Sequence, residues 1–196
     1  MKMNLPNKLT MLRVIMVPFF VAFLLLTPEY PNFKWVALIL FAVASLTDLL
    51  DGYIARKYHL VTNFGKFMDP LADKLLVSAA LVCLTALGKI PAWMTIVIIS
   101  REFIISGFRL IAAERGIVIA AGWLGKWKTA VTMIMLVMML LVVNGAGIVF
   151  DPTETMGVYG WLLLIADVLL WISVILTVVS LIDYLVKNKD VMKDEA

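Results

Sequence analysis

Charged residues and cysteine are both scarce in this sequence, and each shortage excludes a class of protein. Only 16% of the 196 residues are charged and 63% are hydrophobic, whereas about a quarter of the residues in soluble domains are charged. Cys83 is the single cysteine, which excludes an internal disulfide framework. The formal net charge of +3 is modest, and we expect no nucleic-acid partner. The composition indicates an integral membrane protein.

The sequence also lacks the cleavage signal of a secreted protein. Basic residues precede the first apolar stretch, as they do in a signal peptide, but residues 27–31 contain no small-residue cleavage pattern. We therefore expect a retained first transmembrane helix. The length leaves room for one domain, so residues 1–196 are predicted to form a single transmembrane domain.

Long apolar runs dominate the rest of the chain. A bilayer core requires about 20 mostly apolar residues per helix, and glycine and proline mark the breaks between runs, for example Gly65 with Pro70 and Gly88 with Pro91. The predicted fold class is all-α integral membrane with six transmembrane helices, at about residues 10–27, 34–57, 70–88, 91–113, 127–147 and 158–186.

Basic residues are distributed unequally between the two ends of these spans. With six spans both termini lie on the same side, and fourteen of the seventeen lysines and arginines fall on that side. Lys34 and Lys89 fall on the other side, and Arg101 lies inside the fourth span. Because basic residues are retained in the cytoplasm, both termini are predicted to be cytoplasmic, in a bacterial cell membrane.

Four aspartates flank the link between the second and third spans. Asp48 and Asp51 are three residues apart, and Asp69 and Asp73 are four residues apart. On helices each pair shares a face, and the two helices would be consecutive and antiparallel. We therefore expect the four carboxylates to meet near the cytoplasmic end, where intramembrane ionisable groups usually serve a function.

Four neighbouring carboxylates require a positive counter-charge. A lysine or an arginine is one possible source. The all-oxygen donor set favours a hard cation, Mg²⁺ or Mn²⁺, and such ions bind through carboxylates together with substrate phosphates. Two ions would suit an in-line displacement at phosphorus. The sequence thus predicts a divalent-metal site for a phosphate-bearing substrate.

Residues next to the aspartates fit a phosphate ligand. Gly52 and Gly65 permit close approach of a ligand, although helix packing explains them equally well. The planar fork of Arg56 suits phosphate oxygens. Pro70 is predicted in the first turn of its helix, which places Asp69 near that helix's N-terminus.

The pattern Asp-x-x-Asp-Gly-x-x-Ala-Arg, eight residues, then Gly-x-x-x-Asp-x-x-x-Asp runs from Asp48 to Asp73. It resembles the CDP-alcohol phosphotransferase family. The resemblance implies six transmembrane helices, a homodimer and a site open to the cytoplasm. It also implies that Asp73 is the general base and lies with the metal ligands Asp48, Asp51 and Asp69. The implied lining of the CDP-lipid pocket is Gly52, Ala55, Arg56 and Gly65.

Two other segments, residues 4–13 and 100–129, resemble bacterial phosphatidylglycerophosphate synthases, a branch of that family. The implied reaction transfers the phosphatidyl group of CDP-diacylglycerol to sn-glycerol 3-phosphate and releases CMP. Asn7 and Thr10 are added to the CDP-lipid pocket, because they follow the same three-residue interval as Arg13. Alternatively, these three side chains only cap and anchor the first helix.

Basic residues of the fourth and fifth spans are predicted to bind the acceptor phosphate: Arg101, Arg109, Lys126 and Lys128. Arg101 is costly inside an apolar helix unless it is paired or ligand-bound. Glu102 is predicted to point away from it, since adjacent helical residues do not face each other. The alternative for the lysines is simple cytoplasmic placement, or contact with anionic lipid head groups.

Other functions fit parts of the pattern. Within the family, the acceptor would be phosphatidylglycerol (as in a cardiolipin synthase), inositol phosphate or serine. Outside it, an intramembrane prenyltransferase uses Asp-rich motifs and Mg²⁺, but with another aspartate spacing. A cation transporter would also place carboxylates in a membrane, but it needs a route across the bilayer, whereas the charges here gather at one side.

Overall fold

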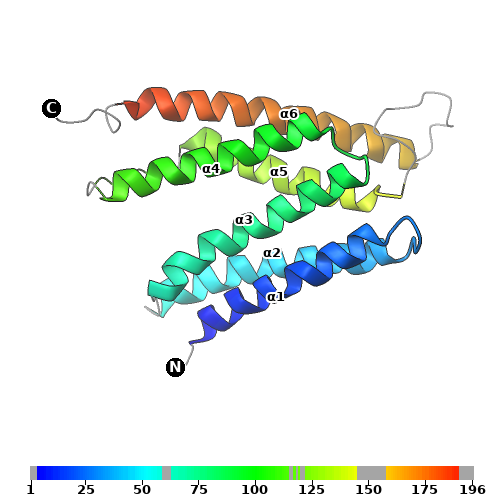
Figure 1. The fold of residues 1–196 in the computed structure, drawn as a ribbon, viewed down its shortest axis with the longest axis horizontal. Coiled ribbons are helices and arrows are strands. Elements are labelled where there is room, and N and C mark those ends of the chain that lie inside the picture. The colour runs from blue at the N-terminus through cyan, green and yellow to red at the C-terminus, as the bar shows by residue number, and fades with distance from the viewer. Residues whose placement is uncertain are drawn as a thin grey trace. The chain divides into compact units, whose positions relative to one another are not determined.

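The computed structural model describes residues 4–58, 63–114, 117, 119, 122–144 and 158–189. Within these helices it does not describe the side chains at positions 49, 52, 53, 55, 56, 63–67, 69, 70, 73, 114, 158 and 159. The described part is all helical, which confirms the all-α part of the predicted fold class. Its helices (Figure 1) are α1 (Leu5–Leu25), α2 (Phe33–Lys57), α3 (Asn63–Ala86), α4 (Ala92–Glu114), α5 (Trp123–Leu141) and α6 (Val158–Lys187).

Helix α1 begins earlier than the hydropathy pattern predicts, at Leu5 instead of near residue 10. The side chain of Asn4 caps the helix, because its Oδ1 accepts a hydrogen bond of 3.2 Å from the backbone N–H of Asn7. Pro6 lies in the first turn, where its missing N–H costs nothing. Helix α5 also begins and ends before its predicted limits, at Trp123 and Leu141.

Helix α3 differs most from its prediction. It begins at Asn63, so Gly65 and Pro70 lie inside the helix and do not form a break. The predicted placement of Pro70 in the first turn, with Asp69 near the helix N-terminus, is therefore wrong. Glycine and proline are weaker helix breakers in membrane proteins, since neighbouring groups satisfy the freed backbone atoms.

Three helical segments of the described part have the length and hydropathy of membrane spans: Leu5–Leu25, Trp123–Leu141 and Gly160–Lys187. Their exposed sides are apolar as well. On α1, for example, Ile15 is 54% exposed and Phe19 is 57% exposed, while Phe20 is fully buried. A helix that is apolar on its exposed side as well as on its buried side fits a lipid environment.

The chain divides into two compact units, of which the first comprises residues 1–89 and 139–147. In this unit α1 packs along both α2 and α3. Phe20 of α1 and Phe41 of α2 are fully buried, and their ring centroids lie 5.7 Å apart. Figure 1 shows that the C-terminal end of α2 and the N-terminal end of α3 lie at the same end of this unit as the start of α1.

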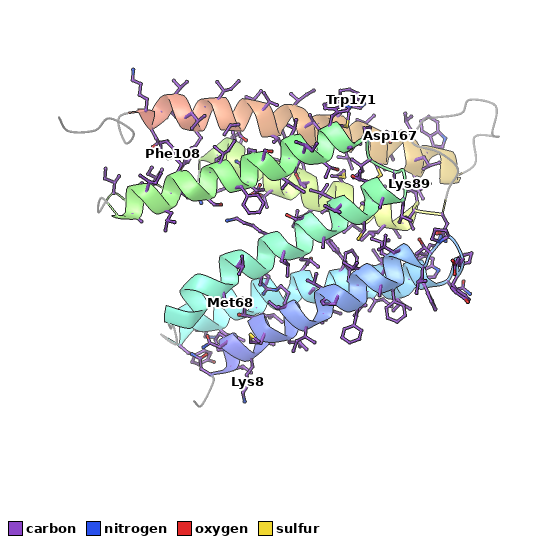
Figure 2. The ribbon with its side chains drawn as sticks, viewed as in Figure 1. Lys8, Met68, Lys89, Phe108, Asp167 and Trp171 are labelled. Carbon is purple, nitrogen blue, oxygen red and sulfur yellow. The ribbon has the colours of Figure 1, made fainter. Side chains whose placement is uncertain are left out.

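The second unit comprises residues 90–138 and 148–196. In this unit α4 packs against α6 around a hydrophobic cluster of Ile105, Phe108, Ala112 and Tyr184. The ring of Phe108 (Figure 2) meets the ring of Tyr184 edge-on, at 79° with centroids 5.7 Å apart. This aromatic contact fixes how α4 lies on α6 near their charged residues.

Candidate functional site

The two aspartates of α2 converge on one arginine of α1. Arg13 Nη1 lies 2.6 Å from Asp48 Oδ1, and Arg13 Nη2 lies 2.5 Å from Asp51 Oδ2. The arginine side chain is fully buried, the Asp51 side chain is 2% exposed and the Asp48 side chain is 35% exposed. The three-residue spacing therefore places both carboxylates on the face of α2 that meets α1.

Thr10 and Asn7 lie about one and two helical turns before Arg13, respectively, and are buried with it. The Thr10 hydroxyl donates to the Pro6 carbonyl at 3.1 Å and to Asp51 Oδ2 at 3.5 Å. The capping side chain is that of Asn4, not Asn7. Thr10 thus faces an aspartate of the motif, and its place in the CDP-lipid pocket stays a prediction.

The contact between Arg13 and both aspartates was not predicted. The sequence carried a signal for it, because an arginine inside an apolar helix requires a partner, and Arg13 shares the interval of Asn7 and Thr10. Arg13 therefore supplies a positive counter-charge to two of the four aspartates, Asp48 and Asp51. Its partners depend on how α1 packs on α2, which a single sequence does not reveal.

The other motif residues are placed only through their backbone. Asp69 and Asp73 belong to α3, whose N-terminal end lies at the same end of the unit as the C-terminal end of α2 (Figure 1). Their side chains lie outside the described part, as do those predicted for the CDP-lipid pocket: Gly52, Ala55, Arg56 and Gly65. Their roles stay predictions.

The described donor atoms fit a divalent cation in chemical type. Carboxylate oxygens of Asp48 and Asp51 meet the two terminal nitrogens of one guanidinium, and hard cations prefer such oxygen ligands. Among the described residues no group of three or more His, Cys, Asp or Glu side chains could hold a metal ion. The predicted ligand set also includes Asp69 and Asp73 of α3, whose side chains lie outside the described part.

A second ionic cluster lies in the other unit, where one carboxylate pairs with two cations. Glu102 Oε1 lies 3.1 Å from Arg101 Nη1 and 2.5 Å from Lys128 Nζ. Arg101 and Lys128 are buried, with side chains 8% and 2% exposed. The prediction that Glu102 points away from Arg101 is wrong, because the long arginine side chain reaches around the helix to its neighbour.

Hydroxyl groups of α6 and α5 extend this cluster. Arg101 Nη2 donates to Ser180 Oγ at 3.2 Å, and Ser180 Oγ donates to the Thr177 carbonyl at 3.1 Å. Ser173 Oγ lies 2.7 Å from Thr132 Oγ1 of α5. The buried Nε of Arg101 has no hydrogen-bond partner in the described part. The cluster therefore joins helices α4, α5 and α6.

The four cations predicted to bind the acceptor phosphate divide into two kinds. Arg101 and Lys128 are buried and share one carboxylate, whereas Lys126 and Arg109 are exposed. Arg109 lies over the ring of Tyr184, 5.7 Å from its centroid. Eight residues of helix separate it from Arg101, which is about 12 Å along the axis. The structure therefore defines polar contacts for the buried pair, whereas the binding of an anion by any of the four stays a prediction.

A cavity of about 290 Å³ lies at the other end of the first unit. It adjoins the turn after α3, where Gly88 has a φ of 69°. Lys89 follows in this turn (Figure 2), and burial lowers the pKa of its amino group. Thr27, a lining residue, follows Arg13 by fourteen residues, about 20 Å of helical rise. No predicted site residue lines it: its residues are Thr27, Pro28, Pro31, Leu87, Lys89, Val143 and Asn144.

Comparison with known proteins agrees with the resemblance found in the motif. The sequence profile of the family described as CDP-alcohol phosphatidyltransferase matches residues 3–179. The chain is 44% identical to a protein of Bacillus subtilis (strain 168) named CDP-diacylglycerol--glycerol-3-phosphate 3-phosphatidyltransferase, over 97% of each chain. Relatives with the same name are 40% identical in Haemophilus influenzae, over 99% of this chain and 98% of the relative, and 36% identical in Rickettsia bellii, over 90% and 91%. The chain belongs to the CDP-alcohol phosphatidyltransferase family.

Proposed function

We propose that this chain transfers the phosphatidyl group of CDP-diacylglycerol to sn-glycerol 3-phosphate, which gives phosphatidylglycerophosphate and CMP. The observation that carries the proposal is that Asp48 and Asp51 of the motif both meet the buried guanidinium of Arg13. The names of the relatives support the choice of substrates. A bound Mg²⁺ or Mn²⁺ pair, held by Asp48, Asp51, Asp69 and Asp73, would neutralise the diphosphate charge.

The chain's own residues then handle the proton and the substrates. Asp73 takes the proton of the acceptor hydroxyl, whose oxygen forms a bond to the β-phosphorus of CDP-diacylglycerol. The bond from that phosphorus to the bridging oxygen breaks, and CMP leaves. Positioning and electrostatic stabilisation supply most of the catalysis in phosphoryl transfer. The CDP-lipid would be lined by Asn7, Thr10, Gly52, Ala55, Arg56 and Gly65.

The acceptor phosphate would bind the cations of α4 and α5. Arg101 and Lys128 are buried next to the carboxylate of Glu102, and an anion would accept from the Nε of Arg101, which has no hydrogen-bond partner among the described residues. Arginine and lysine form strong charge-assisted hydrogen bonds with phosphate. Arg109 and Lys126 are exposed and would add long-range attraction for the anionic acceptor.

The proposed setting is a bacterial cell membrane crossed by all six helices. Both termini and the site would face the cytoplasm, because fourteen basic residues fall on that side of a six-span topology. A homodimer is the proposed assembly, by the family resemblance. Cysteine accessibility labelling at position 2 and in the loop of residues 145–157 tests the topology, since the two sites must label from opposite sides.

The reaction is tested by CMP release from the purified chain in detergent. The assay contains CDP-diacylglycerol, sn-glycerol 3-phosphate and Mg²⁺ or Mn²⁺, and compares the native chain with Asp73→Asn. The matched control is Asp183→Asn, which removes a carboxylate whose described partner is Lys187, one turn along α6. We expect the native chain and the control to release CMP and form phosphatidylglycerophosphate, whereas Asp73→Asn does neither.

Other outcomes separate the alternatives. CMP release with phosphatidylglycerol, inositol phosphate or serine, but not with glycerol 3-phosphate, would keep the family reaction and change the acceptor. Absence of CMP release from folded protein with every acceptor would remove the transferase proposal. Metal-dependent CMP release would count against a cation transporter.

A further inference from the structure

Arg13 occupies the point at which two predicted metal ligands meet. Its two terminal nitrogens each lie against a different carboxylate, at 2.6 Å from Asp48 and 2.5 Å from Asp51. A guanidinium more often pairs both nitrogens with one carboxylate. Here one cation bridges two carboxylates of the same helix face, as a metal ion does.

This arrangement removes a repulsion that the metal-free protein would otherwise contain. Two carboxylates one turn apart on a helix repel each other, and Asp51 is only 2% exposed, so water screens it poorly. A buried arginine is also costly unless it is paired. Each side of the cluster therefore stabilises the other when no metal is bound.

The position of Arg13 is fixed by the apolar packing of α1. Its side chain is fully buried, and the same helix face continues with Val17, Phe20 and Leu24, each no more than 5% exposed. Thr10 adds a hydroxyl to Asp51 from the preceding turn. The guanidinium therefore cannot move into solvent without disturbing the contact between α1 and α2.

We propose that Arg13 is a positioning residue that stands in for the divalent cation. It keeps Asp48 and Asp51 together and neutralised in the metal-free protein, and it competes with the incoming ion for their oxygens. This inference rests on the proposed function, because it takes Asp48 and Asp51 as metal ligands. It assigns to Arg13 a role that is separate from contact with either substrate.

The proposal predicts how metal affinity and stability change when the positive charge of Arg13 is removed. A positive charge a few ångströms from a divalent ion repels it even at an effective dielectric constant of about 20. Arg13→Met keeps an apolar side chain in the packed face but removes this repulsion. The variant should therefore bind metal more tightly and be less stable without metal.

The experiment measures metal binding and unfolding, independently of activity. Mn²⁺ binding to the full chain in detergent is followed by the electron paramagnetic resonance signal of the free ion. Thermal unfolding is recorded with EDTA and with saturating Mn²⁺. For Arg13→Met we expect an apparent Kd for Mn²⁺ lower by about tenfold or more, a lower Tm in EDTA, and a larger gain in Tm on adding Mn²⁺ than the native chain gives.

Two further variants control the result. Lys187→Met also removes a lysine or arginine that pairs with an aspartate, but at the exposed end of α6, and should leave the Kd for Mn²⁺ unchanged. Arg13→Lys keeps the charge on a single head group, which cannot place two nitrogens on two carboxylates. Its Kd for Mn²⁺ should lie between the native and Arg13→Met values, and it keeps the test decisive if Arg13→Met does not fold.

The outcomes distinguish this inference from the proposed function. A Kd for Mn²⁺ that rises or stays constant in Arg13→Met and Arg13→Lys would overturn the stand-in role, while native CMP release would leave the reaction intact. A native chain that binds no Mn²⁺ and releases no CMP would overturn both. Tighter Mn²⁺ binding by the variant, together with native CMP release, supports both.

Discussion

The two ionic clusters of this protein are built with opposite signs. In the first unit one buried guanidinium, Arg13, pairs with the carboxylates of Asp48 and Asp51. In the second unit one carboxylate, Glu102, pairs with the buried cations of Arg101 and Lys128. The formal charge of the first three side chains is −1, and that of the second three is +1.

The difference indicates which ligand each cluster suits. A cluster whose charged side chains sum to a net charge attracts a ligand of the opposite sign, most strongly where water screens it poorly. The sign of the first cluster therefore suits the cation, and the sign of the second suits the anionic acceptor, that the proposed reaction would bind. In the first cluster, Arg13 limits the repulsion between the two aspartates. In the second cluster, Glu102 limits the repulsion between the two cations.

The largest expected effect comes from removing a carboxylate of the first cluster. Asp48→Asn and Asp51→Asn should each lower CMP release by about a thousandfold or more, because each removes a proposed metal ligand. Asp51→Asn should also lower the free energy of unfolding in EDTA by about 3 kcal/mol, since it leaves a buried arginine with one partner fewer. Asp48 is 35% exposed, so its variant should lose less stability.

Initial rates of CMP release and thermal unfolding in EDTA check these two variants. Equal losses of stability for both would contradict the idea that burial decides how strongly each carboxylate depends on Arg13. Full activity in either variant would remove that residue from the metal site.

The second effect concerns the cations of the other cluster. Arg101→Met and Lys128→Met should each raise the KM for sn-glycerol 3-phosphate by about tenfold or more, because a charge-assisted hydrogen bond contributes about 1.5–3 kcal/mol. The KM for CDP-diacylglycerol should stay constant. Steady-state kinetics with each substrate varied in turn provides the measurement, and a similar rise in both values would indicate a structural role only.

The third prediction is a decrease in the KM for sn-glycerol 3-phosphate, opposite to the increase expected for Arg101→Met and Lys128→Met. Glu102→Gln keeps the shape of the side chain but removes the charge that neutralises Arg101 and Lys128. It should lower the KM for sn-glycerol 3-phosphate by about threefold to tenfold, because the anion meets a more positive site, and it should lower the Tm. A higher KM for sn-glycerol 3-phosphate in Glu102→Gln would mean that Glu102 orients the two cations. Its role would then differ from that of Arg13.

The smallest effect tests the hydroxyl contact of Arg101. Ser180→Ala removes the acceptor that lies 3.2 Å from Arg101 Nη2. One hydrogen bond contributes about 1 kcal/mol, so the KM for sn-glycerol 3-phosphate should change about fivefold at most. Thr177→Val is the matched control, because the Thr177 hydroxyl donates to the Ser173 carbonyl of its own helix. A larger change in the control would locate the effect in helix packing.

The sequence predicts the helices well and the ionic partners poorly, for a physical reason. Runs of about 20 apolar residues identify membrane-length helices without any tertiary information. The start of α3 at Asn63 was missed because Gly65 and Pro70 are ordinary breakers in water. Tertiary packing of membrane helices overrides that preference.

Side-chain partners depend on packing between helices, or on reach along one helix. The spacing of Asp48 and Asp51 predicts their shared face, but the arginine that meets them belongs to α1. The rule that adjacent helical residues do not face each other predicts no contact between Arg101 and Glu102. The arginine side chain is long enough to make this contact. Spacing rules predict which residues share a face of one helix, whereas most contacts in the two clusters join different helices.

The hydroxyl groups of α6 have a consequence for how this protein enters the membrane. Thr177 Oγ1 donates to the Ser173 carbonyl, and Ser180 Oγ donates to the Thr177 carbonyl, so both donors are satisfied by their own helix. The segment can therefore leave the translocon as a separate helix without exposing these donors to lipid. Arg101 has no such internal partner on α4 apart from Glu102 in the described contacts. Lys128 of α5 and Ser180 of α6, which contact Glu102 and Arg101, are synthesised after α4, so the ionic cluster is completed only when α5 and α6 dock on α4.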